Sequence, residues 1–433
     1  MKNSFWMRSA LHKVMPWLWA AVWFTLPVSM KANAVSLIIF GLAAIVFAFF
    51  ERPVFDRRQV ILAGLFILFF AWHGVSLIFD PDPQNAWKLL ERKLSLVAIP
   101  VILLLVSGTM KDTGKWALRG LVAGLVLTGA FLLVVALVKL ASGHPPESFT
   151  YHKFTGPLNF SAIYYSCYLS ATIFFLLFRT TEVFIDRFKL PLILFLILLL
   201  LVSASKLFII LTIPVVIWAI VKKYTPKKGL MKFLIPVVAV LLALGGSVPV
   251  FNRLMELKNT DFQVVVRDEY RYDTPLNGLT FRMILWRFAG EIMKDENAWL
   301  TGTGIASKQD VLNGYYLKYG LYTGNPDLGD KGYLDYNFHA QYLETLVGTG
   351  VPGLFLLCAI IIFIFFKGRS KHFFPLVVYI TTTLFLFTES ILERQAGIVF
   401  FCMIWNLAVH VQQETVINHG TNFNHHLKQG ELA

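Results

Sequence analysis

Long apolar runs alternate with short polar segments along most of the chain. The runs hold roughly 15 to 27 residues, and the longer ones are enough to cross about 30 Å of hydrocarbon at about 1.5 Å per residue. A soluble core helix seldom stays uncharged over that length. The pattern predicts an all-α integral membrane protein with about twelve transmembrane helices, near residues 15–30, 35–50, 59–79, 94–108, 116–140, 160–178, 189–204, 207–221, 231–249, 340–366, 373–388 and 396–411.

Lysine and arginine residues gather in every second loop between these runs. The short loops of the other set are poor in cations, except around Lys88, Arg92 and Lys93, where acidic residues dilute the charge. Because cytoplasmic loops carry the excess of Lys and Arg, we predict that both termini are cytoplasmic. The cation-rich loops contain Lys2, Arg8, Lys13, Arg52, Arg57, Arg58, Lys111, Lys115, Arg119, Arg179, Arg187, Lys189, Lys222, Lys223, Lys227, Lys228, Lys232, Lys367, Arg369 and Lys371.

One polar segment, residues 250–339, is far longer than the other loops and falls on the outer side. Loops of that length without a role are uncommon. Apolar residues recur at helical spacing between Phe281 and Ile292, which predicts an amphipathic helix. The turn Gly302-Thr303-Gly304 and a tyrosine-rich stretch follow. The chain is therefore expected to divide into transmembrane helices 1–9, a large helical periplasmic loop, transmembrane helices 10–12 and a cytoplasmic tail, at 1–249, 250–339, 340–411 and 412–433.

Composition agrees with a membrane protein, because 56% of the residues are hydrophobic and only 15% are charged. The net charge of +13 comes largely from the cation-rich loops. No basic stripe with interleaved aromatic residues is present, so we predict no nucleic-acid partner. No HExxH cluster occurs, no nucleotide-binding glycine motif stands at a strand–turn–helix, and the three cysteines lie in apolar runs without metal-ligand spacing. We therefore predict that the protein uses no metal and no other cofactor.

Several polar side chains stand at the predicted outer membrane boundary, where they are costly unless used. Lys206 is interpreted either as a lysine that marks a helix end or as a cation that meets a phosphate. Arg282 is interpreted either as a solvated arginine on a surface helix or as a guanidinium that binds a pyrophosphate through two parallel hydrogen bonds. His339 opens a helix, whose dipole favours the neutral imidazole, so it is either a general base or a hydrogen-bonding partner of the loop.

Three further polar residues accompany these candidates. Gln341 and Glu344 project from one side of the helix that His339 opens, roughly opposite the histidine. Glu389 is expensive at this depth if it is unpaired, so it is expected to bond to Arg394 or to a cation elsewhere. Pairing of this kind is a structural role.

Taken together, these motifs resemble the O-antigen ligase and polymerase superfamily. The resemblance rests on Arg282-x-x-x-Trp286, on Gly302-Thr303-Gly304, and on the run from Asn337 to Gly353 that contains His339-Ala340-Gln341-Tyr342-Leu343-Glu344. It covers about residues 200–355, and Tyr164-Tyr165 and the twelve-span layout agree with it. Two departures are present: the order is Asn-Phe-His where the family has His-Asn, and Ser205-Lys206 stands where family members commonly carry a serine and an arginine.

The resemblance implies a GT-C-like fold in the bacterial inner membrane, with the large loop over a cavity that admits an undecaprenyl-pyrophosphate-linked glycan. Lys206 and Arg282 would hold the pyrophosphate, although the lysine lacks the fork of an arginine. His339 would deprotonate or position the acceptor hydroxyl, so that His339 and Arg282 are the expected catalytic residues. The expected contacts to sugar or acceptor are Trp286, Gln341, Glu344 and Glu389.

The acceptor is not identified by the sequence. Ligation of O-antigen to lipid A-core is favoured, and polymerisation of repeat units and transfer to a protein hydroxyl are the alternatives. A transporter of polysaccharide or lipid and a non-catalytic scaffold are rivals from other classes. Transporters tend to bury ionisable residues at mid-membrane or to use broken helices in repeated halves. An enzyme requires that Lys206, Arg282 and His339 converge in space, and a transporter does not.

Overall fold

The computed structural model describes residues 2–107, 110, 112–145, 149–178, 183–224, 260–272, 274–325, 327, 329–367 and 373–409. Within these residues the fold is all helical, as predicted, with one isolated β-bridge between Asn325 and Asp330 and no sheet. The predicted span 231–249 and the tail after 409 lie outside the described residues.

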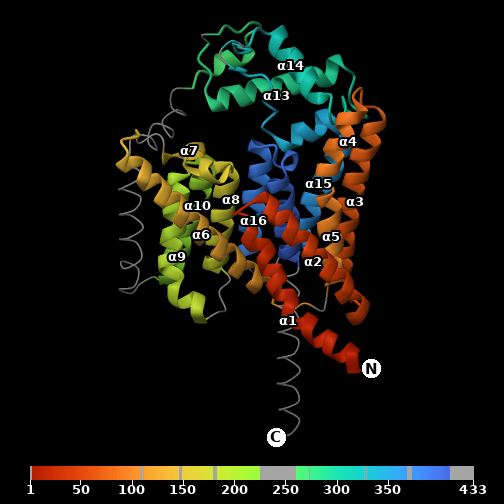
Figure 1. Cartoon of the computed structure of the whole chain (residues 1–433). Helices are drawn as coiled ribbons and strands as arrows, with labels where there is room; N and C mark the ends of the chain where they lie inside the picture. Colours follow the sequence, from red (N-terminus) through yellow and green to blue (C-terminus); the bar gives the residue numbers. More distant parts are fainter. Residues whose placement is uncertain are drawn as a thin grey trace.

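The apolar runs form a bundle of helices (Figure 1). Four of the described helices are long and apolar enough to cross a membrane, namely α2, α3, α6 and α15, and a bent pair that contains α8 is a fifth candidate. The protein is thus a multi-pass membrane protein. The bundle contains α1 (Lys2–Thr25), α2 (Met30–Glu51), α3 (Arg57–Ile78), α5 (Ser95–Leu105), α6 (Thr113–Ala141), α8 (Ala162–Phe178), α9 (Val183–Val202), α10 (Lys206–Tyr224), α15 (Gln341–Lys367), α16 (Phe373–Thr388) and a last helix, Gln395–Val409.

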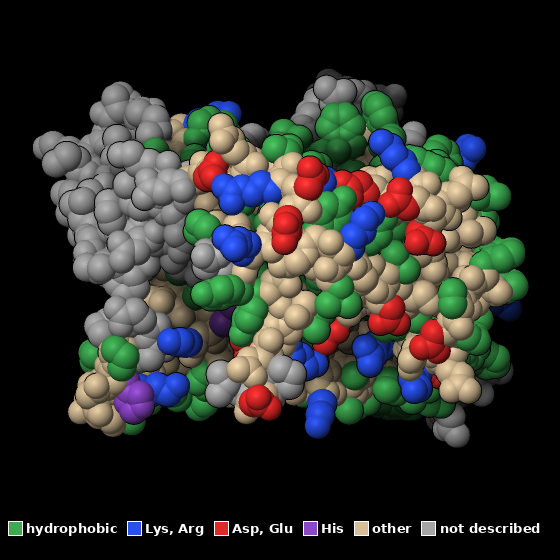
Figure 2. All heavy atoms as spheres, turned by 90° about the horizontal axis from the view of Figure 1, so that it is seen from above, with side chains coloured by type: hydrophobic (Ala, Val, Ile, Leu, Met, Phe, Trp, Pro, Cys, Tyr) green, Lys and Arg blue, Asp and Glu red, His purple; other side chains and the backbone are tan. Residues whose placement is uncertain are grey.

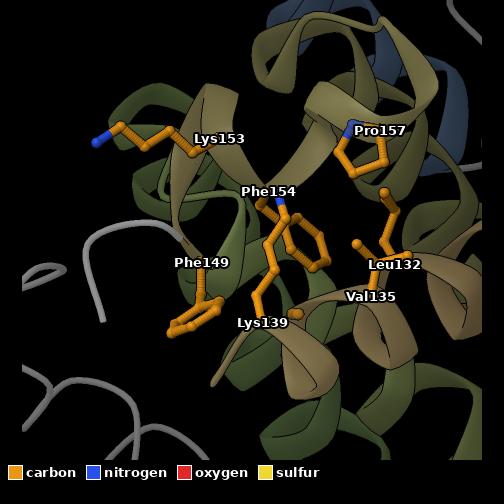
Figure 3. A pocket seen from close by; sticks show the side chains of 8 residues that line it. Leu132, Val135, Lys139, Phe149, Lys153, Phe154 and Pro157 are labelled. Atoms are coloured by element: carbon orange, nitrogen blue, oxygen red, sulfur yellow. The ribbon is translucent and has the colours of Figure 1, made fainter. Parts of the chain in front are cut away.

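A short bent segment precedes α8. It consists of α7 (Tyr151–Thr155) and η2 (Gly156–Leu158), and it meets α8 at 87°. A gap of about 10 Å³ separates α7 from the end of α6. Figure 3 shows Lys139 reaching toward Phe154 in this gap, whereas Lys153 points away from it. Because such a space holds about one water molecule, it is a packing gap rather than a ligand site.

The described part of the long polar segment, from residue 260 onward, folds into helices with a small core of its own. The predicted amphipathic helix is confirmed as α13 (Gly278–Asp295), which Asn277 caps by accepting hydrogen bonds from the backbone of Leu279 and Thr280. The apolar face of α13, from Phe281 to Met293, is buried against η3 (Phe262–Val266) and α14 (Lys308–Lys318).

Helices α13 and α14 lie at the end of the bundle opposite the N-terminus (Figure 1). They share this end with α4 (Pro83–Arg92), a short helix that the apolar pattern does not predict. Lys93, one of the cations that break the loop-charge pattern, is buried directly after α4. Figure 2 looks down on this end and shows acidic and basic side chains interspersed, so neither sign of charge gathers into one patch.

Helices α4, α13 and α14 and the segments that connect them, up to residue 339, are called the outer layer below. The turn Gly302-Thr303-Gly304 joins this outer layer to α15. The backbone N–H of Thr303 donates to the carbonyl of Val347 at 2.7 Å, and the N–H of Val351 donates to the carbonyl of Trp299 at 2.8 Å. These bonds form where α15 is broken at Gly350, whose φ of 71° is in the left-handed region. Gly302 and Gly350 therefore serve close packing between the loop and α15, because a Cβ on either would overlap backbone atoms across this contact.

Replacing Gly350 by alanine is expected to lower the melting temperature of the detergent-solubilised protein. A left-handed residue with a Cβ costs about 1–2 kcal/mol, and here the Cβ would also overlap the carbonyl oxygen of Leu300. Gly290→Ala is the matched control, because Gly290 lies inside α13 with open space around it and should gain up to about 1 kcal/mol of helix propensity. An equal change in the two variants would contradict this assignment.

Candidate functional site

A cavity of about 1020 Å³ lies between the outer layer and the helix bundle. One wall is formed by α7, η2 and the start of α8, and the other by residues 329–339 of the outer layer. The first turns of α13 and residues 389–394, which follow α16, complete it. This volume falls at the upper end of the range of small-molecule pockets, so the cavity can admit a ligand of the size of a few sugar rings.

Glu389 joins two of the predicted site residues at the edge of this cavity. Its Oε1 atom lies 2.8 Å from Nη2 of Arg282, and its Oε2 atom lies 3.3 Å from Nδ1 of His339. Arg282 also donates from Nε to the carbonyl of Thr388 at 3.2 Å and from Nη1 to that of Gly278 at 3.0 Å. Side chains from the outer layer, the start of α15 and the end of α16 thus converge.

The carboxyl group of Glu389 is held ionised by its neighbours. Burial alone would raise its pKa, but the hydrogen bond and charge of His339 and the guanidinium of Arg282 together bring the pKa below its ordinary value. With Nδ1 of His339 donating to this carboxylate, the lone pair of the neutral ring is on Nε2. His339 can then accept a proton at Nε2, and Glu389 stabilises the imidazolium that forms, as the carboxylate of a hydrolytic triad does.

Backbone strain is concentrated around the cavity. Four of the residues that line it have a positive φ although none is glycine: Tyr151 at 56°, Asn159 at 52°, Asp335 at 66° and His339 at 47°. The conformation of His339 is supported by its N–H, which donates to the side chain of Asn337 at 3.0 Å. Such strain persists only where surrounding contacts determine it, and it is found mainly at functional sites.

The structure separates the other predicted site residues from this cavity. Among the described residues that line it, Lys206, Trp286, Gln341 and Glu344 are absent. Lys206 is half-buried at the start of α10, and Trp286 packs its ring against Phe387, with centroids 5.2 Å apart. Gln341 and Glu344 are 0% and 2% exposed, so the geometry does not present them to a sugar.

Gln341 and Glu344 instead hold the chain segments that carry the site. Oε2 of Glu344 accepts from the backbone N–H of Phe338 at 3.2 Å and from the hydroxyl of Ser390 at 3.1 Å. Phe338 precedes His339, and Ser390 follows Glu389. The side-chain oxygen of Gln341 accepts from the N–H of Leu392 at 2.7 Å. One turn of α15 therefore fixes the relative positions of the two site segments.

A buried ion network, defined here as Lys93, Lys308, Glu344 and Glu393, extends behind that turn. Lys308 lies 2.7 Å from Glu344 and 3.1 Å from Glu393, which in turn lies 2.7 Å from Lys93. Burial raises the pKa of Glu393, but Lys308 and Lys93 bring it below its ordinary value. Burial lowers the pKa of both lysines. Glu344 and Glu393 reverse this for Lys308, whereas the pKa of Lys93 stays below its ordinary value because the charge of Lys308 adds to the effect of burial.

Sequence reasoning missed Lys93, Lys308 and Glu393. Lys93 belongs to the loop that breaks the predicted pattern of cation-rich and cation-poor loops, which is the signal that could have singled it out. Among the described residues no group of three or more His, Cys, Asp or Glu side chains is placed to hold a metal ion.

Comparison with protein families confirms the resemblance drawn from the residues. Residues 191–358 match the family model Wzy_C, described as O-antigen ligase. The matched segment runs from α9 into α15 and contains Arg282 and His339, and it ends before Glu389 and Arg394. Comparison with curated proteins found no match. The matched family is one of membrane enzymes of the O-antigen ligase and polymerase type, whose substrates are lipid-linked glycans.

Proposed function

We propose that this chain, whose residues 191–358 match the O-antigen ligase family, is a ligase-type membrane glycosyltransferase. It transfers a glycan from undecaprenyl pyrophosphate to an acceptor hydroxyl, with lipid A-core as the favoured acceptor. The observation that carries the proposal is the convergence of Arg282 and His339 on Glu389 at one large cavity. Lys206, the third residue expected to converge in an enzyme, does not line this cavity. A transporter would have no need for a base and a guanidinium held together by one carboxylate.

The proposed topology has twelve spans with both termini in the cytoplasm of a bacterium and the large loop in the periplasm. The loop-charge pattern supports it, as does the position of α13 and α14 at the end opposite the N-terminus (Figure 1). The cavity then lies at the periplasmic face of the inner membrane, where the pyrophosphate of a lipid carrier would be.

In the proposed reaction the acceptor hydroxyl gives its proton to Nε2 of His339 as its oxygen bonds to the anomeric carbon of the donor. The bond from that carbon to the phosphate oxygen breaks, and the electron pair leaves with undecaprenyl pyrophosphate. Arg282 faces the developing charge. A guanidinium has five N–H groups, and three of them are engaged by Glu389, Thr388 and Gly278, so two are free for the leaving group.

The purified chain in lipid nanodiscs, supplied with an undecaprenyl-pyrophosphate-linked O-antigen and a choice of acceptors, tests this function. We expect free undecaprenyl pyrophosphate and a glycan joined to lipid A-core. Growth of the carrier-linked chain would instead show a polymerase, and a glycosylated peptide would show a protein oligosaccharyltransferase. Movement of the carrier across a bilayer without release of undecaprenyl pyrophosphate would contradict the enzyme and favour the transporter.

A further inference from the structure

Among the described residues, three lysine or arginine side chains line the cavity, and two of them are already paired. Arg282 pairs with Glu389 at 2.8 Å, and Lys331 pairs with Asp335 at 3.0 Å. The third, Arg394, forms no hydrogen bond or ion pair through its guanidinium with any residue in the described parts of the chain, and its side chain is exposed. It therefore differs from the other two cations in having its full charge and its fork available to a ligand.

The backbone that carries Arg394 is firmly held. The preceding turn η5 (Ile391–Glu393) is fixed by Gln341, which accepts from Leu392, and by the buried ion network, which holds Glu393. The carbonyl of Arg394 accepts from Gly397 and Ile398 at 3.0 and 3.1 Å, where the last helix begins. Glu393 thus points into the protein and Arg394 into the cavity, from a rigid base.

A bound pyrophosphate needs a positive charge that the other paired groups of the cavity do not supply. The positive charge of Arg282 is balanced by the carboxylate of Glu389, so this pair brings no net charge to a bound anion. A pyrophosphate ester carries negative charge that requires compensation out of water. Lys206, which the family resemblance places in this role, is not among the residues that line the cavity.

We infer that Arg394 is the second pyrophosphate-binding cation of this site, and that it takes the role expected of Lys206. The inference rests on the proposed function, since it names the group that holds the leaving pyrophosphate of that reaction. Arg282 and Arg394 enter the cavity from α13 and from the segment after α16, and a guanidinium binds phosphate oxygens with two parallel hydrogen bonds.

Binding of undecaprenyl pyrophosphate without an acceptor tests the inference independently of turnover. Arg394→Gln is expected to weaken this binding about 10- to 100-fold, which corresponds to a charge-assisted hydrogen bond of roughly 1.5–3 kcal/mol. Arg394→Lys should recover part of the loss, and Lys206→Gln should bind as the wild type does. Lys331→Gln is the matched control for a cavity cation that already has a partner, and melting temperatures would verify that all variants are folded.

Two results would overturn the inference: wild-type affinity in Arg394→Gln, or a loss confined to Lys206→Gln. If undecaprenyl pyrophosphate binds and Arg394→Gln weakens it, but no acceptor is glycosylated, the proposed transfer fails and the cation assignment stands. In a working assay, Arg394→Gln should raise KM for the lipid-linked donor by the same factor and leave KM for the acceptor unchanged.

Discussion

Replacing His339 by alanine is expected to slow glycan transfer by about 10²- to 10⁴-fold, the range that general bases contribute. Nε2 of this imidazole is the atom left to accept a proton, because Nδ1 faces Glu389 at 3.3 Å. Removal of the ring leaves the acceptor hydroxyl to attack without a base. The rate is measured as release of undecaprenyl pyrophosphate at a saturating concentration of donor. Equal amounts of wild type and variant are compared, and their melting temperatures verify that both are folded.

Glu389→Gln tests whether His339 and Glu389 act together, as a general base and the carboxylate that supports it, or contribute to catalysis independently. The amide cannot stabilise the imidazolium as a charge does, so this variant should also lose at least about 10²-fold in rate. Because Glu389 acts through His339, the double variant should be no slower than His339→Ala alone. Glu296→Gln is the control, since Glu296 is exposed at the end of α13.

Additive losses in the double variant would show that Glu389 acts only by holding Arg282. Transfer at the wild-type rate in His339→Ala would remove the histidine from the mechanism altogether, and the proposed proton acceptor would be wrong.

The features that local pattern decides could be predicted from the sequence. The helix over 281–292 appears as α13 because its apolar residues repeat at helical spacing and need only one buried face. Four of the described bundle helices, α2, α3, α6 and α15, follow from apolar runs whose length matches a bilayer. Other predicted runs form shorter helices, such as α5 with 11 residues. The family resemblance implies that Arg282 and His339 belong to one site, and the structure joins them through Glu389.

The features that depend on distant contacts could not be predicted. Glu344 and Gln341 are polar and close to His339 in the sequence, which favours a role in binding. Their direction is instead set by Ser390 and Leu392, which lie 46 and 51 residues away. The pair of Lys93 and Glu393 spans 300 residues. No periodicity along the chain records such a pairing, and the right-angle bend before α8 is equally unmarked.

Replacing Lys308 by methionine is expected to destabilise the protein by about 3–5 kcal/mol, the usual cost of removing one partner of a buried charge pair. Lys308 is 6% exposed and contacts both Glu344 and Glu393, so its loss leaves two buried carboxylates with too little positive charge. Lys318→Met on the same helix is the matched control. Lys318 forms an exposed pair with Asp295 and lies over the rings of Tyr315 and Tyr319, and at an exposed site each of these contacts is worth at most about 1 kcal/mol.

The pH dependence of stability shows whether Lys308→Met is destabilised by the loss of a charge. In the wild type the pKa of Glu393 is depressed, so the network stabilises the fold above the unfolded value of about 4.3 and is lost as the pH falls through the folded value. Without Lys308, burial should raise the pKa of Glu393 above its unfolded value, so this variant is destabilised most near neutral pH.

The melting temperatures of wild type and Lys308→Met should therefore differ most at pH 7 and converge as the pH falls toward 4. A difference in melting temperature that grows as the pH falls would show that Lys308 acts by packing rather than by charge. Since Glu344 also holds Phe338 and Ser390, beside His339 and Glu389, transfer should fall in this variant even below its melting temperature. The ion network would then connect the stability of the outer layer to the geometry of the base.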